Sequence, residues 1–265
     1  MIQTQTRYCP IGHPAVDFDT ETSILDLPRA SVVEIALQVL QGAGVELVEW
    51  DALLYIRMKV PRKRRDFSYL VPDDRLEDAS NILASIDLPL SAPSDLLLKT
   101  NDEYAKGRFY RITRSTLSPV ISHIVLYPFS LMPVLPSELS AQAPSHLSPS
   151  RCSNILVPRP SAACAFLLRA MTKYPRFCYT RTVLQSNLEE LVLYFFLGYT
   201  LHDLPKGEED EWVREDEHRR IAAASQVIKQ WSSDQEWRQG EEWMGDVLAA
   251  VVAGDDRLLN SLSAQ

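Results

Sequence analysis

The sequence lacks the short motifs that identify several common enzyme classes. It has no Gly-x-Ser-x-Gly turn, no Walker-type loop and no paired His-x-x-x-His, so a serine hydrolase, a P-loop enzyme and a zinc protease have no support. Cysteine is also scarce, and the few cysteines lie far apart without the Cys-x-x-Cys spacing of a zinc site. We expect them to be reduced thiols. They are Cys9, Cys152, Cys164 and Cys178.

Long apolar runs are absent as well. The most apolar segment, residues 188–197, is interrupted by Glu189 and Glu190, and the N-terminus shows no basic segment followed by an apolar one. We therefore expect neither a membrane span nor a secretory signal. These features predict a cytoplasmic protein with no membrane partner, and leave a nuclear location open.

Positive charge is in the minority, with 27 Lys and Arg against 35 Asp and Glu, and the net charge is -8. A pI near 5.2 disfavours a dedicated nucleic-acid binder, so sequence-specific binding to nucleic acid is not expected. The 46% hydrophobic and 23% charged residues are typical of a globular protein.

Hydrophobic periodicity predicts strands and helices in the first half of the chain. Residues 1–25 predict an irregular arm, after which Ser31 and Glu34 form a capping-box pattern that predicts the start of a helix. Strands and short helices then follow. The expected strands are 45–48, 66–71, 109–113 and 121–126, and the expected helices are 51–58 and one that begins after Pro72.

The second half has a different pattern. Residues 132–150 contain four prolines and five serines, which favours an extended, solvated linker. The predicted domains are therefore an α/β domain over 26–131 and a helical domain over 151–265. Within the second domain, the expected helices are 160–172, 184–197, 216–231 and 241–253.

The order of elements over residues 45–71 resembles the core of the nucleotidyltransferase superfamily. A strand, a helix that begins with Ala52 and Leu53, a loop with Arg62 after a proline, and a strand that begins with Asp66 follow one another. The same order occurs in the AbiEii-type and minimal nucleotidyltransferases and their fungal relatives. The resemblance implies an α/β (α+β) fold, with a small mixed sheet and flanking helices followed by a helical domain.

The resemblance also implies a site in which family residues are replaced. In the family a Gly pair ends the first strand and Asp-x-Asp begins the later one, whereas this chain has Glu49, Trp50 and Ser68 at three of those positions. Nucleotidyl transfer needs carboxylates that hold Mg²⁺ on a nucleoside triphosphate. A hydroxyl is a poor ligand for Mg²⁺, and only a glycine turn lets phosphate approach the backbone closely. The replacements predict a catalytically impaired site.

Asp66 is the candidate metal ligand and the first candidate catalytic residue. Glu49 and Asp51 are acids that would complete a rearranged site with it, if the protein is an active enzyme that uses Mg²⁺ and a nucleoside triphosphate. The alternative is that Asp66 forms an ion pair with a neighbouring arginine. His123, on an apolar strand, is interpreted as a core histidine.

A basic run, made of Arg57, Lys59 and the four cations at 62–65, lies beside the expected cleft, and the part from 59 to 65 is called the basic loop below. It could bind a triphosphate or a nucleic-acid backbone, act as a targeting signal, or form a solvated loop. Its position favours binding. The candidate nucleotide contacts are Arg62, Lys63, Arg64, Arg65, Trp50 and Ser68.

The C-terminal half is acidic and rich in tryptophan. The charged segment 202–220 is either a solvated loop that leads into an exposed helix or a docking surface for a basic protein partner. The tryptophans after residue 211 either fill a helical core or mark an interface.

Three functions follow from these patterns. The first is a catalytically impaired nucleotidyltransferase-like protein that binds a nucleotide or a macromolecular partner. The second is an active Mg²⁺-dependent nucleotidyltransferase that acts on a protein, an RNA or a small acceptor. The third is a protein-interaction module, for which we expect Trp50 to fill the cleft and an apolar patch to be exposed elsewhere.

Overall fold

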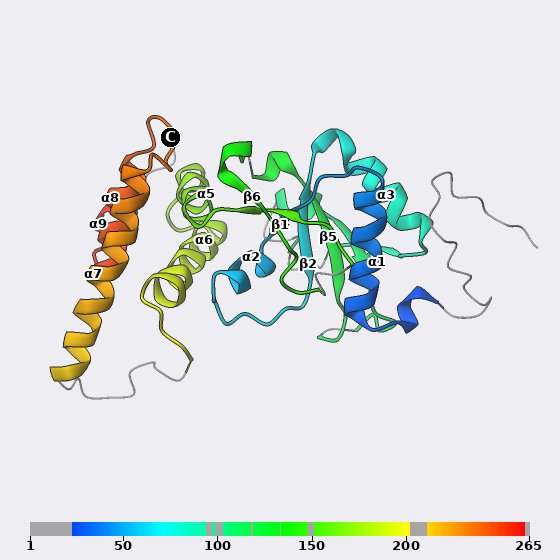
Figure 1. Ribbon diagram of the computed structural model, residues 1–265, viewed down its shortest axis with the longest axis horizontal. Helices are drawn as coiled ribbons and strands as arrows, with labels where there is room; N and C mark the ends of the chain where they lie inside the picture. Colours follow the sequence, from blue (N-terminus) through cyan, green and yellow to red (C-terminus); the bar gives the residue numbers. More distant parts are fainter. Residues whose placement is uncertain are drawn as a thin grey trace, which may run out of the picture.

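The computed structural model describes residues 23–93, 97–98, 103–117, 119–132, 134–147, 151–201 and 211–262. These residues form one mixed sheet with helices on both faces and a further group of helices at one end (Figure 1). The predicted fold class, a mixed α/β sheet followed by a helical region, is confirmed. Most of the predicted N-terminal arm and residues 202–210 of the charged segment lie outside the described residues.

Seven strands form the sheet in the order β3-β4-β5-β2-β1-β7-β6. Strand β1 is antiparallel to β2 and parallel to β7, and β2 is parallel to β5. The central strands are buried along their whole length because helices cover both faces, which explains their nearly continuous apolar sequences. The strands are β1 (Val48–Trp50), β2 (Phe67–Val71), β3 (Leu90–Ser91), β4 (Arg108–Arg111), β5 (His123–Pro128), β6 (Leu139–Gln142) and β7 (Ile155–Pro158).

Two groups of helices cover the two faces of the sheet. Helices α1 (Arg29–Gly42) and α3 (Leu76–Ser85) pack together on one face, where Ser80 contacts Tyr110 of β4. The helix α5 (Pro160–Lys173) covers the other face. Its Phe166 packs edge-on against Trp50 of β1, with 4.8 Å between ring centroids.

The remaining helices extend the molecule beyond α5, away from α1 and α3 (Figure 1). Helix α5 packs on α6, α7 packs on α8, and one hydrophobic core runs from the sheet into this region. Apart from the short helix α9, which the sequence did not predict, these helices agree with the expected ones except for a few residues at their ends. They are α6 (Tyr179–Glu190), the π-helical segment Leu191–Phe196, α7 (Glu211–Ser233), α8 (Trp243–Val252) and α9 (Arg257–Ser261), while α2 (Ala52–Arg57) lies between β1 and β2 in sequence.

The segment 132–150 differs from the solvated linker that its composition predicts. Residues 139–142 form β6, which pairs antiparallel with β7, and Glu138 just before it is buried. Because β6 is an edge strand, its outer N–H groups need no partner, so a proline-rich segment is compatible with the sheet. The sheet therefore extends past residue 131 and includes residues on both sides of the predicted linker.

Two predicted element boundaries also change. Helix α1 begins at Arg29 rather than near Ser31, because Pro28 precedes it with a φ of -54° that suits a helix entry, and no side chain caps it. The first strand lies over Val48–Trp50 rather than 45–48. Glu49 and Trp50 are therefore strand residues, paired with Tyr69 and Ser68, and not the turn that the family pattern places there.

Candidate functional site

Asp66 lies immediately before β2, next to the start of β5. Its Oδ1 accepts a hydrogen bond from the backbone N–H of His123 at 2.7 Å and lies 3.1 Å from Nδ1 of the same residue. The partner of Asp66 in the structure is thus His123, and not the neighbouring arginine that the sequence suggested for an ion pair. Nε2 of His123 is buried and has no hydrogen-bond partner among the described residues.

Asp51 occupies the turn between β1 and α2. Its φ of 51° and ψ of -130° form a conformation that residues with a Cβ rarely adopt, so the backbone here is strained. Burial raises the pKa of Asp51; Arg62 lowers this pKa by a smaller amount, and the nearby Asp66 raises it. The turn thus brings Asp51 into the electrostatic range of Asp66 and Arg62.

Glu49 does not join these acids. It precedes Trp50 in β1, so the two side chains point to opposite faces of the sheet, and Trp50 shares its face with Ser68. The Glu49 carboxylate is fully buried and accepts two hydrogen bonds from Arg57, at 2.7 and 2.8 Å. The rearranged set of three acids predicted from the sequence is therefore not assembled, because strand alternation separates Glu49 from Asp66.

Glu49 belongs instead to a buried polar cluster on the far face. His146 lies above it, with Nδ1 3.9 Å from a Glu49 oxygen and Nε2 2.6 Å from the Tyr69 hydroxyl. Burial, together with the smaller effects of the nearby Arg64 and Arg57, lowers the pKa of His146 from 6.5 to about 4. The imidazole is therefore neutral at pH 7 and fastens the segment after β6 to the sheet.

Trp50 and Ser68 lie side by side in the sheet and are both buried. Only 3% of Trp50 is exposed, and its indole fills the space between β1 and Phe166 of α5. Its Nε1 is buried without a partner among the described residues. Neither residue is placed to contact a ligand from solvent.

The basic loop divides into one fixed arginine and three exposed cations. The Arg62 Nε donates to Glu190 at 2.7 Å, its Nη2 donates to Asn187 at 2.6 Å, and the guanidinium lies 4.0 Å from the centre of the Tyr55 ring. These contacts join the loop to α6. Lys63, Arg64 and Arg65 are exposed.

The residues present do not fit a catalytic Mg²⁺ site of the expected kind. Asp66 and Asp51 are the predicted carboxylates that remain near each other, and one oxygen of Asp66 already accepts a backbone N–H. Among the residues that the structure describes, no group of three His, Cys, Asp or Glu side chains could hold a metal ion. A catalytic Mg²⁺ ion needs more oxygen ligands from the protein than these two carboxylates supply.

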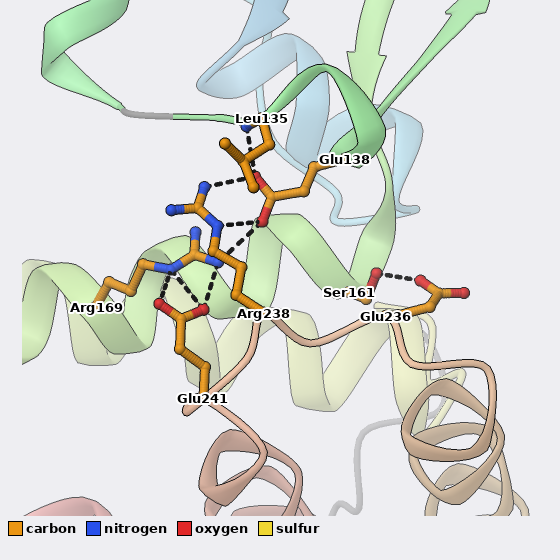
Figure 2. Close-up of polar contacts among 7 residues, drawn as sticks. All are labelled: Leu135, Glu138, Ser161, Arg169, Glu236, Arg238 and Glu241. Carbon is orange, nitrogen blue, oxygen red and sulfur yellow. Dashed lines mark hydrogen bonds and ion pairs between the residues drawn. The ribbon is translucent and has the colours of Figure 1, made fainter.

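A second polar cluster, which the sequence did not suggest, links the sheet edge to the C-terminal helices (Figure 2). The buried Glu138 accepts hydrogen bonds from Arg169 of α5 and from two nitrogens of Arg238, and Arg169 also binds Glu241. Close by, Ser161 donates to Glu236. These residues come from three distant parts of the chain, so no local pattern could have identified them.

No family model matches the chain, and no curated protein matches it. A solved structure of an antigenic nucleotidyltransferase-like protein from Paracoccidioides brasiliensis aligns with 77% of this chain and 90% of its own length, at 9% identity and a TM-score of 0.38. No helix in the described ranges has the length and apolar character needed to cross a bilayer.

Proposed function

We propose that this chain is a nucleotidyltransferase-like protein that does not carry out metal-dependent transfer and that acts by binding. The main support comes from Arg62, the arginine of the family pattern, whose guanidinium is hydrogen-bonded to Glu190 and Asn187. Asp66 is likewise committed to His123, and Glu49 to Arg57. Side chains that a transferase would direct at metal and triphosphate are thus used to hold the fold together.

The exposed part of the basic loop is the proposed binding surface. Lys63, Arg64 and Arg65 are consecutive and exposed, and a cluster of cations attracts phosphate or another anionic group. The proposed ligand is a nucleotide or an anionic surface of a macromolecular partner, bound on the exposed loop rather than against β1, because Trp50 of β1 is buried against Phe166.

Thermal unfolding with each nucleoside triphosphate, with and without Mg²⁺, tests this proposal. A ligand that binds the native state raises the unfolding midpoint. We expect any rise to be independent of Mg²⁺, unchanged in Asp66→Asn, and abolished when Lys63, Arg64 and Arg65 are replaced by serine. Lys229→Ser on α7 is the matched surface control. A Mg²⁺-dependent rise that Asp66→Asn abolishes would instead favour the active enzyme and justify a search for its acceptor.

A protein-interaction module is the second candidate function. It is favoured by Trp50, which fills the cleft, and by exposed apolar residues around the start of α6, where Phe177 is 90% and Tyr179 57% exposed. Trp231 and Trp237 are buried against each other, so the exposed acids of α7 are the remaining contact for a basic partner. This candidate predicts no midpoint shift with any nucleotide. A photocrosslinking residue at position 177, but not one at position 77, should then capture a protein that binds again when purified.

A further inference from the structure

A cavity of 270 Å³ lies between α5, α6 and the residues that precede β4 and follow β5. Its walls are largely aromatic and aliphatic, with Tyr104, Phe166 and Tyr174 among them. The polar residues that line it include Arg169 and Lys173, and none of the described residues in its lining is an acid. None of the predicted site residues lines this cavity, but one of its walls adjoins them, since Phe166 packs edge-on against Trp50.

The charges around the cavity leave one cation available. Arg169 and Arg238 carry two positive charges, and Glu138 and Glu241 balance them within the cluster of Figure 2. Lys173 is exposed and has no ion pair with any residue in the described ranges. The site therefore presents a net charge of +1. The Lys173 side chain carries this charge and can turn toward a ligand.

The C-terminal end of α5 would ordinarily repel an anion, because its last carbonyl groups carry partial negative charge. Here two of these carbonyls are already satisfied. Arg181 donates to the carbonyl of Met171, and the Thr172 hydroxyl donates to the carbonyl of Arg169 at 2.7 Å. The cationic Arg181 also offsets the partial charge, so an anion beside Lys173 meets little opposition.

The volume limits the size of the ligand. An apolar cavity of about 150 Å³ accommodates one benzene ring, and pockets for drug-sized ligands span about 300–1,000 Å³. A cavity of 270 Å³ therefore encloses one substituted ring and is too small to enclose a nucleoside triphosphate. A second cavity of 370 Å³ shares Arg169, Thr172 and Lys173 with it. Glu241 also lines this second cavity, but it is ion-paired with Arg169, so the charged end of the ligand has room beside Lys173.

We propose that this cavity binds a small aromatic carboxylate. The ring lies among Tyr104, Phe166 and Tyr174, where aromatic rings pack favourably edge-on or offset, and the carboxylate binds the ammonium group of Lys173. A single available cation matches a monoanion better than a doubly charged phosphate ester. This site goes beyond the function proposed above, since it uses neither the basic loop nor Asp66.

Calorimetric titration of the full chain with benzoate, benzyl alcohol and acetate tests the proposal, because these probes separate the ring from the charge. We expect benzoate to bind at least about tenfold more tightly than benzyl alcohol, and acetate not to bind measurably. Lys173→Met should reduce benzoate affinity to that of benzyl alcohol. Lys229→Met, another exposed lysine changed in the same way, should leave both affinities as they are.

A second variant tests the cavity itself. Ala170 lines it, and Ala170→Leu should fill part of the space and abolish binding of benzoate and benzyl alcohol alike. Lys173 is exposed, so its variant remains informative even if Ala170→Leu unfolds. Failure of benzoate to bind, equal affinity for benzoate and acetate, or unchanged benzoate affinity in Lys173→Met would each overturn the proposal.

Discussion

Replacement of Glu138 by glutamine should strongly destabilise the protein, because this carboxylate joins three separate parts of the chain. It is 3% exposed and accepts hydrogen bonds from Arg169, from two nitrogens of Arg238 and from the backbone N–H of Leu135. Glutamine keeps the shape but removes the charge and turns an N–H₂ group toward the arginines. Removing one partner of a buried ion pair costs about 3–5 kcal/mol.

The expected loss for Glu138→Gln is at the lower end of that range, about 3 kcal/mol, since Arg169 keeps Glu241 as a partner. Urea denaturation at pH 7 measures it, followed by tryptophan fluorescence and far-UV circular dichroism together. Trp50 reports on the sheet, and Trp231 and Trp237 report on the C-terminal helices. An unchanged slope with urea would show that stability alone has changed.

The pH dependence gives a second measure of the same carboxylate. Burial opposes ionisation of Glu138, but hydrogen bonds from Arg238, Leu135 and Arg169 outweigh it and hold its pKa below the usual value. Ionised Glu138 therefore stabilises the fold above the usual carboxyl pKa, and this contribution is lost as the pH falls from there through the lowered value. The difference in the free energy of unfolding between the wild type and Glu138→Gln should therefore become smaller as the pH falls below the usual carboxyl pKa.

A matched control is Glu77→Gln, which removes an exposed ion pair with Arg108 and should change stability by less than about 0.5 kcal/mol. The reasoning would be refuted if Glu138→Gln cost less than about 1 kcal/mol, a value typical of a surface pair. It would also be refuted if the difference in the free energy of unfolding between the wild type and Glu138→Gln stayed constant down to acidic pH.

Three further predictions concern other parts of the fold. Because burial lowers the pKa of His146 from 6.5 to about 4, unfolding takes up a proton between these values. The wild type should thus lose about 3 kcal/mol more stability than His146→Gln as the pH falls across that interval, as measured by urea denaturation of both proteins at several pH values. Gly107→Ala places a Cβ 2.5 Å from Cε1 of Tyr127 and should cost about 1–3 kcal/mol in the same assay; no loss would show that the ring moves freely. Asp51→Gly relieves the strain of a φ of 51° and should raise the free energy of unfolding by about 1 kcal/mol in the same assay. A fall in the free energy of unfolding would show that the Asp51 side chain makes stabilising contacts.

The sequence predicted the elements more successfully than the contacts between them. Periodicity identified α5, α8 and the strands around Asp66 because their apolar residues follow local rules of spacing. It missed β6 because this edge strand is only four residues long and lies within a segment whose prolines and serines usually mark a linker.

The site shows the same limit. The sequence placed Asp66 and Arg62 near the cleft, yet their partners His123 and Glu190 lie in distant segments, and only the fold brings them together. Glu49 was grouped with Asp66 because the fold inferred from the sequence placed these two acids close together. The predicted strand ended at residue 48, so Glu49 was expected in the turn after it. In the structure Glu49 lies within β1, and alternation along the strand points its side chain to the opposite face from Asp66.

The place of β1 in the sheet has a consequence for synthesis. Strand β1 lies between β2 and β7, and Val48 pairs with Leu156, which leaves the ribosome much later. Until then the nascent chain presents an open strand edge and a sheet face without α5, and such surfaces attract chaperones and neighbouring unfinished chains. A fragment that ends at residue 131 would keep this exposed edge permanently, so we expect it to aggregate when expressed alone.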